Sequence, residues 1–292
     1  MFTVNHVLWI AVCAAFVSAM LWFCIQKGIS IRRAGHWMTA ICAFSEISKI
    51  MCDMMQSPEG GMVLDPRSLP FHLCSLMLFG VLLITFGRNG AARQTIIDFM
   101  AVMGSLGSAC AILIPTNGTS FTSLPAYQCF VYHGGLLWFS LYLAVRNRQR
   151  LGAKALGRNV VLLLALVLAT LYINSILSVY GTNFMYLVRP PMDNLPYLNL
   201  DSGWYAYFFR LLALGAALVT LGCRQLIDFL HFSIIFIIRT APPPSAPIAS
   251  TCFSPAGRTP AWPGRPLRCI SPTPAMALRC MKPSLMQTER SI

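Results

Sequence analysis

Charged residues are what this sequence has least of. Only 11% of its 292 residues are charged, whereas 56% are hydrophobic, and the mean hydropathy is +0.63. A soluble domain carries about a quarter charged residues, so this composition excludes an ordinary soluble protein. Apolar runs of about 20 residues, which this chain does have, are what a helix needs to cross a bilayer. The sequence therefore predicts an integral membrane protein.

Acidic residues are especially scarce, and the formal net charge is +13. Such an excess can indicate a nucleic-acid partner, but most of the Lys and Arg residues sit in short loops and a tail, and no nucleic-acid recognition motif accompanies them. Basic loops between apolar runs are typical of the cytoplasmic loops of membrane proteins. We therefore expect membrane lipid, and no nucleic acid, as the partner.

Metal-ligand spacing is also missing. The chain contains 11 Cys, but no Cys-x-x-Cys pair or other ligand pattern accompanies them. Most of these cysteines lie inside apolar runs, where Cys behaves as a small hydrophobic residue. We expect no metal site and no cofactor.

Seven apolar runs are present, over about residues 5–26, 36–55, 70–87, 95–115, 127–145, 159–180 and 203–223. The linkers between them are too short for a soluble domain. The first run lacks a signal-peptide cleavage site, so we expect it to be retained. The predicted fold class is all-α: a multi-pass protein of the cell membrane with seven transmembrane helices over residues 1–225.

The loop charges predict an orientation. The loops after the first, third and fifth runs hold ten Lys and Arg, and those after the second, fourth and sixth hold two. The positive-inside rule then places the N-terminus outside and the C-terminus in the cytoplasm. Residues 226–239 are expected to extend the last helix or to lie as an amphiphilic segment on the inner membrane face. The Pro-rich residues 240–292 are expected to be a disordered tail.

Polar residues inside the apolar runs gather at one depth. At a rise of 1.5 Å per residue, Cys74 lies about 6 Å below the outer surface, and His133 and Asn174 lie about 9 Å below it. The residues that converge on this outer layer are Lys49, His72, Cys74, His133, Asn174, Trp204 and Arg210. Because polar groups within a bilayer are costly, we interpret the layer as a polar cavity that opens outward.

The cavity's residue types favour nucleophilic chemistry. A Cys thiol becomes a nucleophile beside a base, and Cys74 with His133 would supply that pair, with His72 as an alternative base. Asn174, Lys49 or a backbone N–H could stabilise an oxyanion. A site at the depth of lipid esters suits an acyltransferase or hydrolase that acts on a lipid.

The same residues also have structural interpretations. Glu46, Lys49 and Asp53 can share one helix face and neutralise one another. A lone Cys in a membrane helix is usually a packing residue. His133 precedes two glycines, which allow another helix to approach closely, so His133 could make a structural hydrogen bond at a helix contact.

Two other functional classes stay open. A small-molecule transporter or receptor would use the same cavity, with Lys49, Glu46 and Arg210 as substrate or proton groups. Transporters often show internal repeats, and we find none in this sequence. A non-catalytic membrane protein would depend on neither the Cys nor the Lys.

An ordered set of short motifs resembles a known family. Residues 69–74, Leu-Pro-Phe-His-Leu-Cys, followed by Arg88-Asn89, resemble the signature of the YwaF-like membrane proteins, relatives of the transmembrane protein 164 acyltransferases. Further matches are Pro115, His133-Gly134, residues 183–187, residues 189–191 and residues 203–205. The resemblance covers about residues 65–222, and the Pro-rich tail departs from it.

The resemblance implies a seven-helix fold and a thiol acyltransferase that acts on phospholipid. By position, Cys74 would be the nucleophile and His133 the base, with His72 as the alternative. The residues that we expect to bind the substrate are Lys49, Asn174, Asn183, Tyr186, Trp204 and Arg210.

Overall fold

The computed structural model describes residues 3–56, 60–115, 117–147, 153–191, 195, 197–217 and 219–220. The chain divides into two compact units, Met1–Ala241 and Pro242–Ile292, and all described residues belong to the first. The predicted boundary at residue 225 and the predicted segments 226–239 and 240–292 lie outside the described residues.

Each of the seven apolar runs forms helix. The helices are α1 (Val4–Gln26), α2 (Ile31–Asp53), α3 (Leu73–Phe86), α4 (Ala91–Phe99), the π-helical η2 (Met100–Gly104), α5 (Ser105–Leu113), α6 (Leu124–Asn147), α7 (Ala153–Ile176) and a helix over residues 204–217. The strands β1 (Met54–Gln56) and β2 (Met62–Leu64) form an antiparallel hairpin after α2. Short 3-10 turns complete the described part: η1 (Pro66–Ser68), η4 (Ser178–Tyr180) and η5 (Phe184–Tyr186).

Four helices of the described part are long and apolar enough to cross a membrane. They are Val4–Gln26, the continuous segment Ala91–Leu113 that joins α4, η2 and α5, Leu124–Asn147 and Lys154–Ile176. Helix α3 is apolar but has 14 residues, and α2 has 23 residues but includes charged ones. The chain is thus a mostly helical membrane protein. Seven crossings and the outward N-terminus stay predictions.

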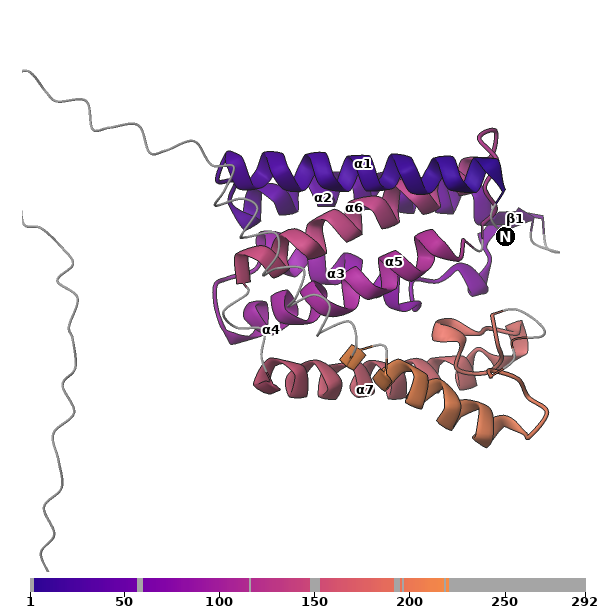
Figure 1. The fold of residues 1–292 in the computed structure, drawn as a ribbon. Helices are drawn as coiled ribbons and strands as arrows, with labels where there is room; N and C mark the ends of the chain where they lie inside the picture. Colours follow the sequence, from indigo (N-terminus) through magenta and orange to yellow (C-terminus); the bar gives the residue numbers. More distant parts are fainter. Residues whose placement is uncertain are drawn as a thin grey trace, which may run out of the picture. The chain divides into compact units, whose positions relative to one another are not determined.

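Helix α6 is the centre of the bundle. It packs against α1, α2 and α5, between which it runs in Figure 1. Glycine makes two of these contacts possible: a Cβ on Gly135 would lie 2.8 Å from Ile41 of α2, and a Cβ on Gly134 would lie 3.4 Å from the sulfur of Cys13 in α1. The sequence-based expectation that these glycines allow close helix approach is confirmed.

A buried carboxylate ties α4, α6 and α7 together at the bundle end opposite the one where α3 begins. The side chain of Asp98 is fully buried and forms an ion pair with Arg158 at 2.8 Å. Asn147 and Gln94 both donate hydrogen bonds to the same carboxylate. Removing one partner of such a network would leave a buried charge unpaired, so we assign Asp98 a structural role.

Candidate functional site

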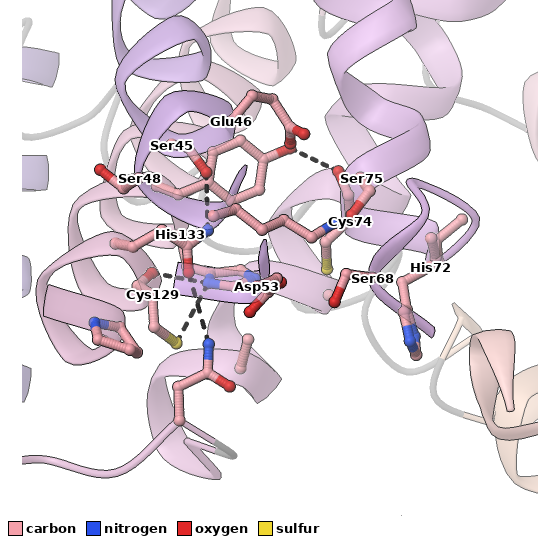
Figure 2. Close-up of a pocket in the computed structure, with 18 of the residues that line it drawn as sticks. Ser45, Glu46, Ser48, Asp53, Ser68, His72, Cys74, Ser75, Cys129 and His133 are labelled. Carbon is pink, nitrogen blue, oxygen red and sulfur yellow. Dashed lines mark hydrogen bonds between the residues drawn. The ribbon is translucent and has the colours of Figure 1, made fainter. Parts of the chain in front are cut away.

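A cavity of about 730 Å³ lies where α2 ends and where α3 and α6 begin, and the η5 turn lines one part of it. Five of the predicted catalytic and substrate-binding residues line this cavity: Lys49, His72, Cys74, His133 and Tyr186. Figure 2 shows three of them: His72 and Cys74 reach it from the start of α3, and His133 reaches it from α6. The helix connections bring together positions as far apart in sequence as 49 and 186.

Cys74 occupies the second position of α3, two residues after the helix cap at His72. The His72 side chain makes no cap hydrogen bond. First-turn N–H groups have no partner within their own helix and give this end of α3 a partial positive charge. Gly107 of α5 leaves room beside it, because a Cβ there would lie 3.7 Å from the Cys74 sulfur.

Tyr132 fixes the backbone at the start of α3. This tyrosine of α6 is almost fully buried and donates a hydrogen bond from its hydroxyl to the carbonyl oxygen of Cys74. The next residue of α6 is His133, so one turn of α6 contacts Cys74 and carries the histidine. Tyr132 therefore sets the position of α3 relative to His133.

The hydrogen bond of His133 determines which ring nitrogen is free. Nδ1 lies 2.7 Å from the carbonyl oxygen of Cys129, one turn earlier in α6. Because a carbonyl oxygen only accepts, Nδ1 carries the proton, and in the neutral ring Nε2 has the free lone pair. The Cys129 sulfur also lies 3.6 Å from Nδ1. Among the described residues, no group forms a hydrogen bond with Nε2.

His72 has the opposite arrangement. Its Nδ1 accepts a hydrogen bond from the backbone N–H of Met185 at 3.3 Å, so Nδ1 is unprotonated and Nε2 carries the proton. Its ring also packs against Phe184 and Tyr186, with centroid distances of 5.6 and 5.3 Å. His72 thus holds the η5 turn against the start of α3 and presents an N–H donor rather than a base.

The charged face of α2 contributes acid and base groups to the cavity. Glu46, Lys49 and Asp53 all line it. The ion pairs found within the described residues are Arg67 with Asp65 and Arg158 with Asp98, so none joins these three side chains. The interpretation that they neutralise one another by direct pairing therefore finds no support in the geometry. Their charges are available to a ligand in the cavity.

Side-chain hydrogen bonds hold the segment 183–189 in place. Two residues that the sequence predicted to bind substrate, Asn174 and Asn183, make these hydrogen bonds. Asn174 is buried, and its amide bonds the backbone of Phe184 twice, to the carbonyl oxygen at 3.0 Å and from the N–H at 2.9 Å. The Asn183 side chain accepts hydrogen bonds from two N–H groups later in the same segment and donates one to the carbonyl oxygen of Arg189. Neither Asn174 nor Asn183 lines the cavity.

Trp204 and Arg210 also lie outside the cavity lining. The Trp204 ring N–H donates to the carbonyl oxygen of Leu187 at 3.0 Å, and Arg210 donates to Asn199 and Ser202. These side chains therefore order the segment after α7. Met185 and Tyr186, which do line the cavity, have positive φ angles of 54°. Such strained backbone persists only where the surroundings enforce it, as these hydrogen bonds do.

Several cavity residues were missed by the sequence analysis. Tyr132, Gln128 and Cys129 come from α6, and Gln128 donates to the Ser45 hydroxyl of α2 at 2.7 Å. A signal was available, because Gln128 and Tyr132 are four residues apart, as are Cys129 and His133, and all lie on adjoining helix faces. Aromatic and cysteine residues on a membrane helix resemble packing residues, which concealed the pattern.

The outer rim of the cavity includes the turn after the β1–β2 hairpin. Arg67 and Ser68 line the cavity there. The Arg67 guanidinium donates to both carboxylate oxygens of Asp65, and these hydrogen bonds lower the pKa of the Asp65 carboxyl below its ordinary value. Asp65 stays charged, and the turn keeps its shape, in mildly acidic solution.

Comparisons with known proteins relate the chain to a protein family. Neither a curated protein nor a solved structure matches the chain. One family model, that of the TMEM164 family, matches residues 1–223, which include all of the helices and cavity residues described above. The chain therefore belongs to the TMEM164 family of membrane proteins.

Proposed function

We propose that the chain transfers or hydrolyses acyl groups of membrane lipids, with Cys74 as the nucleophile and His133 as the base. The observation that carries this proposal is the pairing of two features in one cavity: a thiol in the first turn of α3 and a histidine whose Nε2 is free. These features supply a nucleophile and a proton acceptor. The relation to YwaF-like proteins and the location in the cell membrane belong to the same proposal.

The proposed reaction proceeds in two steps, and His133 and the start of α3 supply the protein groups for both. His133 Nε2 takes the Cys74 thiol proton as sulfur attacks the ester carbonyl carbon, and the developing oxyanion accepts hydrogen bonds from first-turn N–H groups of α3. Collapse breaks the ester C–O bond, and the proton passes from His133 to the leaving oxygen. A lipid hydroxyl or water then attacks the acyl thioester while His133 accepts its proton. The C–S bond breaks, and the proton returns from His133 to the Cys74 sulfur, which restores the thiol.

The other polar residues receive supporting roles. Lys49 is the cavity group suited to a lipid phosphate, because it carries a positive charge and has no ion-pair partner among the described residues. Tyr186 narrows the cavity from the η5 side. Asn174 and Asn183, expected to bind substrate, act instead on the backbone that carries Tyr186.

Thiol labelling tests the proposal. The purified chain in detergent is treated with a lipid-like thiol-reactive probe, and modified peptides are identified by mass spectrometry. We expect Cys74 to label first, labelling to vanish in Cys74→Ala, and its rate to fall roughly 100-fold in His133→Ala, the usual contribution of a general base. Cys110→Ala, which removes another cavity thiol, is the matched control and keeps the rapid reaction.

A second function is favoured by the unpaired charges of α2. A transporter or receptor for small polar molecules would use Lys49 and Glu46 in the same cavity. It would lose ligand binding in Lys49→Ala and tolerate Cys74→Ala, whereas the proposed enzyme would lose all turnover in Cys74→Ala. Labelling spread evenly over many cysteines, insensitive to His133→Ala, would reject the enzyme and leave this alternative.

A further inference from the structure

A second hollow, of about 300 Å³, lies between α3, α4, η2 and α7. Leu76, Phe79 and Leu83 line it from α3, and Leu162 and Leu166 line it from α7. Among the described residues that line it, none carries a charged or polar side chain. We call this hollow the apolar groove.

The floor of the apolar groove depends on Gly80. A Cβ at this position would lie 2.8 Å from the sulfur of Met100 and 3.3 Å from Ile96. Any side chain here would therefore push α3 away from η2 or occupy the groove itself. On the open side, Phe79 is 54% exposed and Leu83 is 40% exposed, so hydrocarbon of the bilayer can reach the groove.

The apolar groove continues the reactive cavity along α3. Residues 73–75 line the cavity, and Leu76 and Met77 line the groove. From Leu76 to Leu83 the groove follows α3 for about 10 Å at 1.5 Å per residue. The sides of the cavity and the groove that face α3 are also in contact. The η5 turn lines the cavity, α7 lines the groove, and the two elements pack against each other. Polarity thus changes from charged to apolar along one helix, starting at Cys74.

We propose that the apolar groove binds the acyl chain of the lipid whose ester group meets Cys74. This inference rests on the proposed function. A lipid has its phosphate and ester at one end and hydrocarbon at the other, and the cavity and groove have the same order of polarity. Burial of methylene groups against leucine and phenylalanine side chains supplies packing without any polar contact. The groove then selects acyl chains by length.

Photocrosslinking locates the chain. The full-length protein is reconstituted in phosphatidylcholine vesicles that contain a phosphatidylcholine with a diazirine near the end of one acyl chain. We expect crosslinks to concentrate on residues 76–83 and 162–166, in both the wild type and Cys74→Ala. Crosslinks spread evenly over exposed helix faces, or replaced by contacts from a second copy of the chain, would overturn the proposal.

Filling the groove provides the matched comparison. Leu166→Trp places a large side chain in it, whereas Leu168→Trp lies on the same helix at a position that is 66% exposed and outside the lining. We expect groove crosslinking to fall at least ten-fold in Leu166→Trp and to stay unchanged in Leu168→Trp, with both proteins monodisperse. Equal crosslinking in the two variants would overturn the proposal.

The experiment separates this inference from the proposed function. Crosslinking to the groove does not depend on acyl transfer by Cys74. It therefore persists in Cys74→Ala if the groove binds lipid chains, even if Cys74 never forms an acyl thioester. Where the wild type does transfer acyl groups, Leu166→Trp should shift its preference toward shorter chains, and Leu168→Trp should not. If Leu166→Trp changes neither the chain-length preference nor the crosslinking, the groove does not bind the acyl chain, whereas the proposed enzymatic activity still stands.

Discussion

At the scale of single residues, hydrogen bonds determine which groups can react. Cys74, His72 and His133 could be predicted from the sequence because chemistry-bearing residues are rare in apolar helices. The protonated nitrogen of each histidine ring could not, because it depends on the neighbours that the fold supplies. The Cys129 carbonyl leaves Nε2 of His133 unprotonated, while the Met185 N–H leaves the proton of His72 on Nε2.

Tyr132 gives the sharpest test at this scale. Tyr132→Phe removes its hydrogen bond to the Cys74 carbonyl, a loss of about 1 kcal/mol, so α3 is less well positioned. We expect labelling of Cys74 to slow about five-fold. Tyr142→Phe is the control, since this buried tyrosine of α6 also donates to a backbone carbonyl, that of Ile29, far from the cavity. Equal labelling rates in the two variants would contradict a positioning role for Tyr132.

At the scale of elements, the apolar runs of the sequence predict where the helices lie, but they do not predict where a helix is interrupted. The run over 95–115 forms α4, η2 and α5, because a π-helical turn interrupts it at Met100–Gly104. The Ser105 hydroxyl bonds the carbonyl oxygens of Ala101 and Val102 there. Such local hydrogen bonding has no hydropathy signal. The ordering of residues 183–189 by Asn174 is equally invisible, because it depends on contacts between separate elements.

Helix packing at η2 is testable through Gly104. A Cβ there would lie 2.3 Å from the Ser140 hydroxyl oxygen of α6, so Gly104→Ala must displace one helix at a cost of roughly 1–3 kcal/mol. We expect the midpoint of thermal unfolding in detergent to fall by several degrees. Gly157→Ala on α7 is the control, because nothing lies within 4 Å of its Cβ position. Helix propensity should leave that midpoint equal or higher. Similar midpoints for both variants would contradict the close η2–α6 contact.

At the scale of the whole molecule, the loop charges predict on which side of the membrane the cavity opens. The cavity lies at the bundle end that the loop charges place outside. Cys52 is exposed at the end of α2 and lines the cavity. In intact cells, a membrane-impermeant maleimide should therefore modify Cys52. Cys269 and Cys280, predicted to be cytoplasmic, should react only after permeabilisation. The reverse pattern would invert the orientation.

If the proposed function is right, Cys74 carries an acyl group during turnover, and peptide mass spectrometry of the full-length protein detects it. The chain is incubated with phospholipid vesicles, quenched in acid and digested. We predict an acyl thioester on the Cys74 peptide, released by hydroxylamine, absent in Cys74→Ala and accumulating far more slowly in His133→Ala. A wild-type protein that remains unacylated at Cys74 while it consumes lipid, or that acylates several cysteines equally, would rule out Cys74 as the nucleophile.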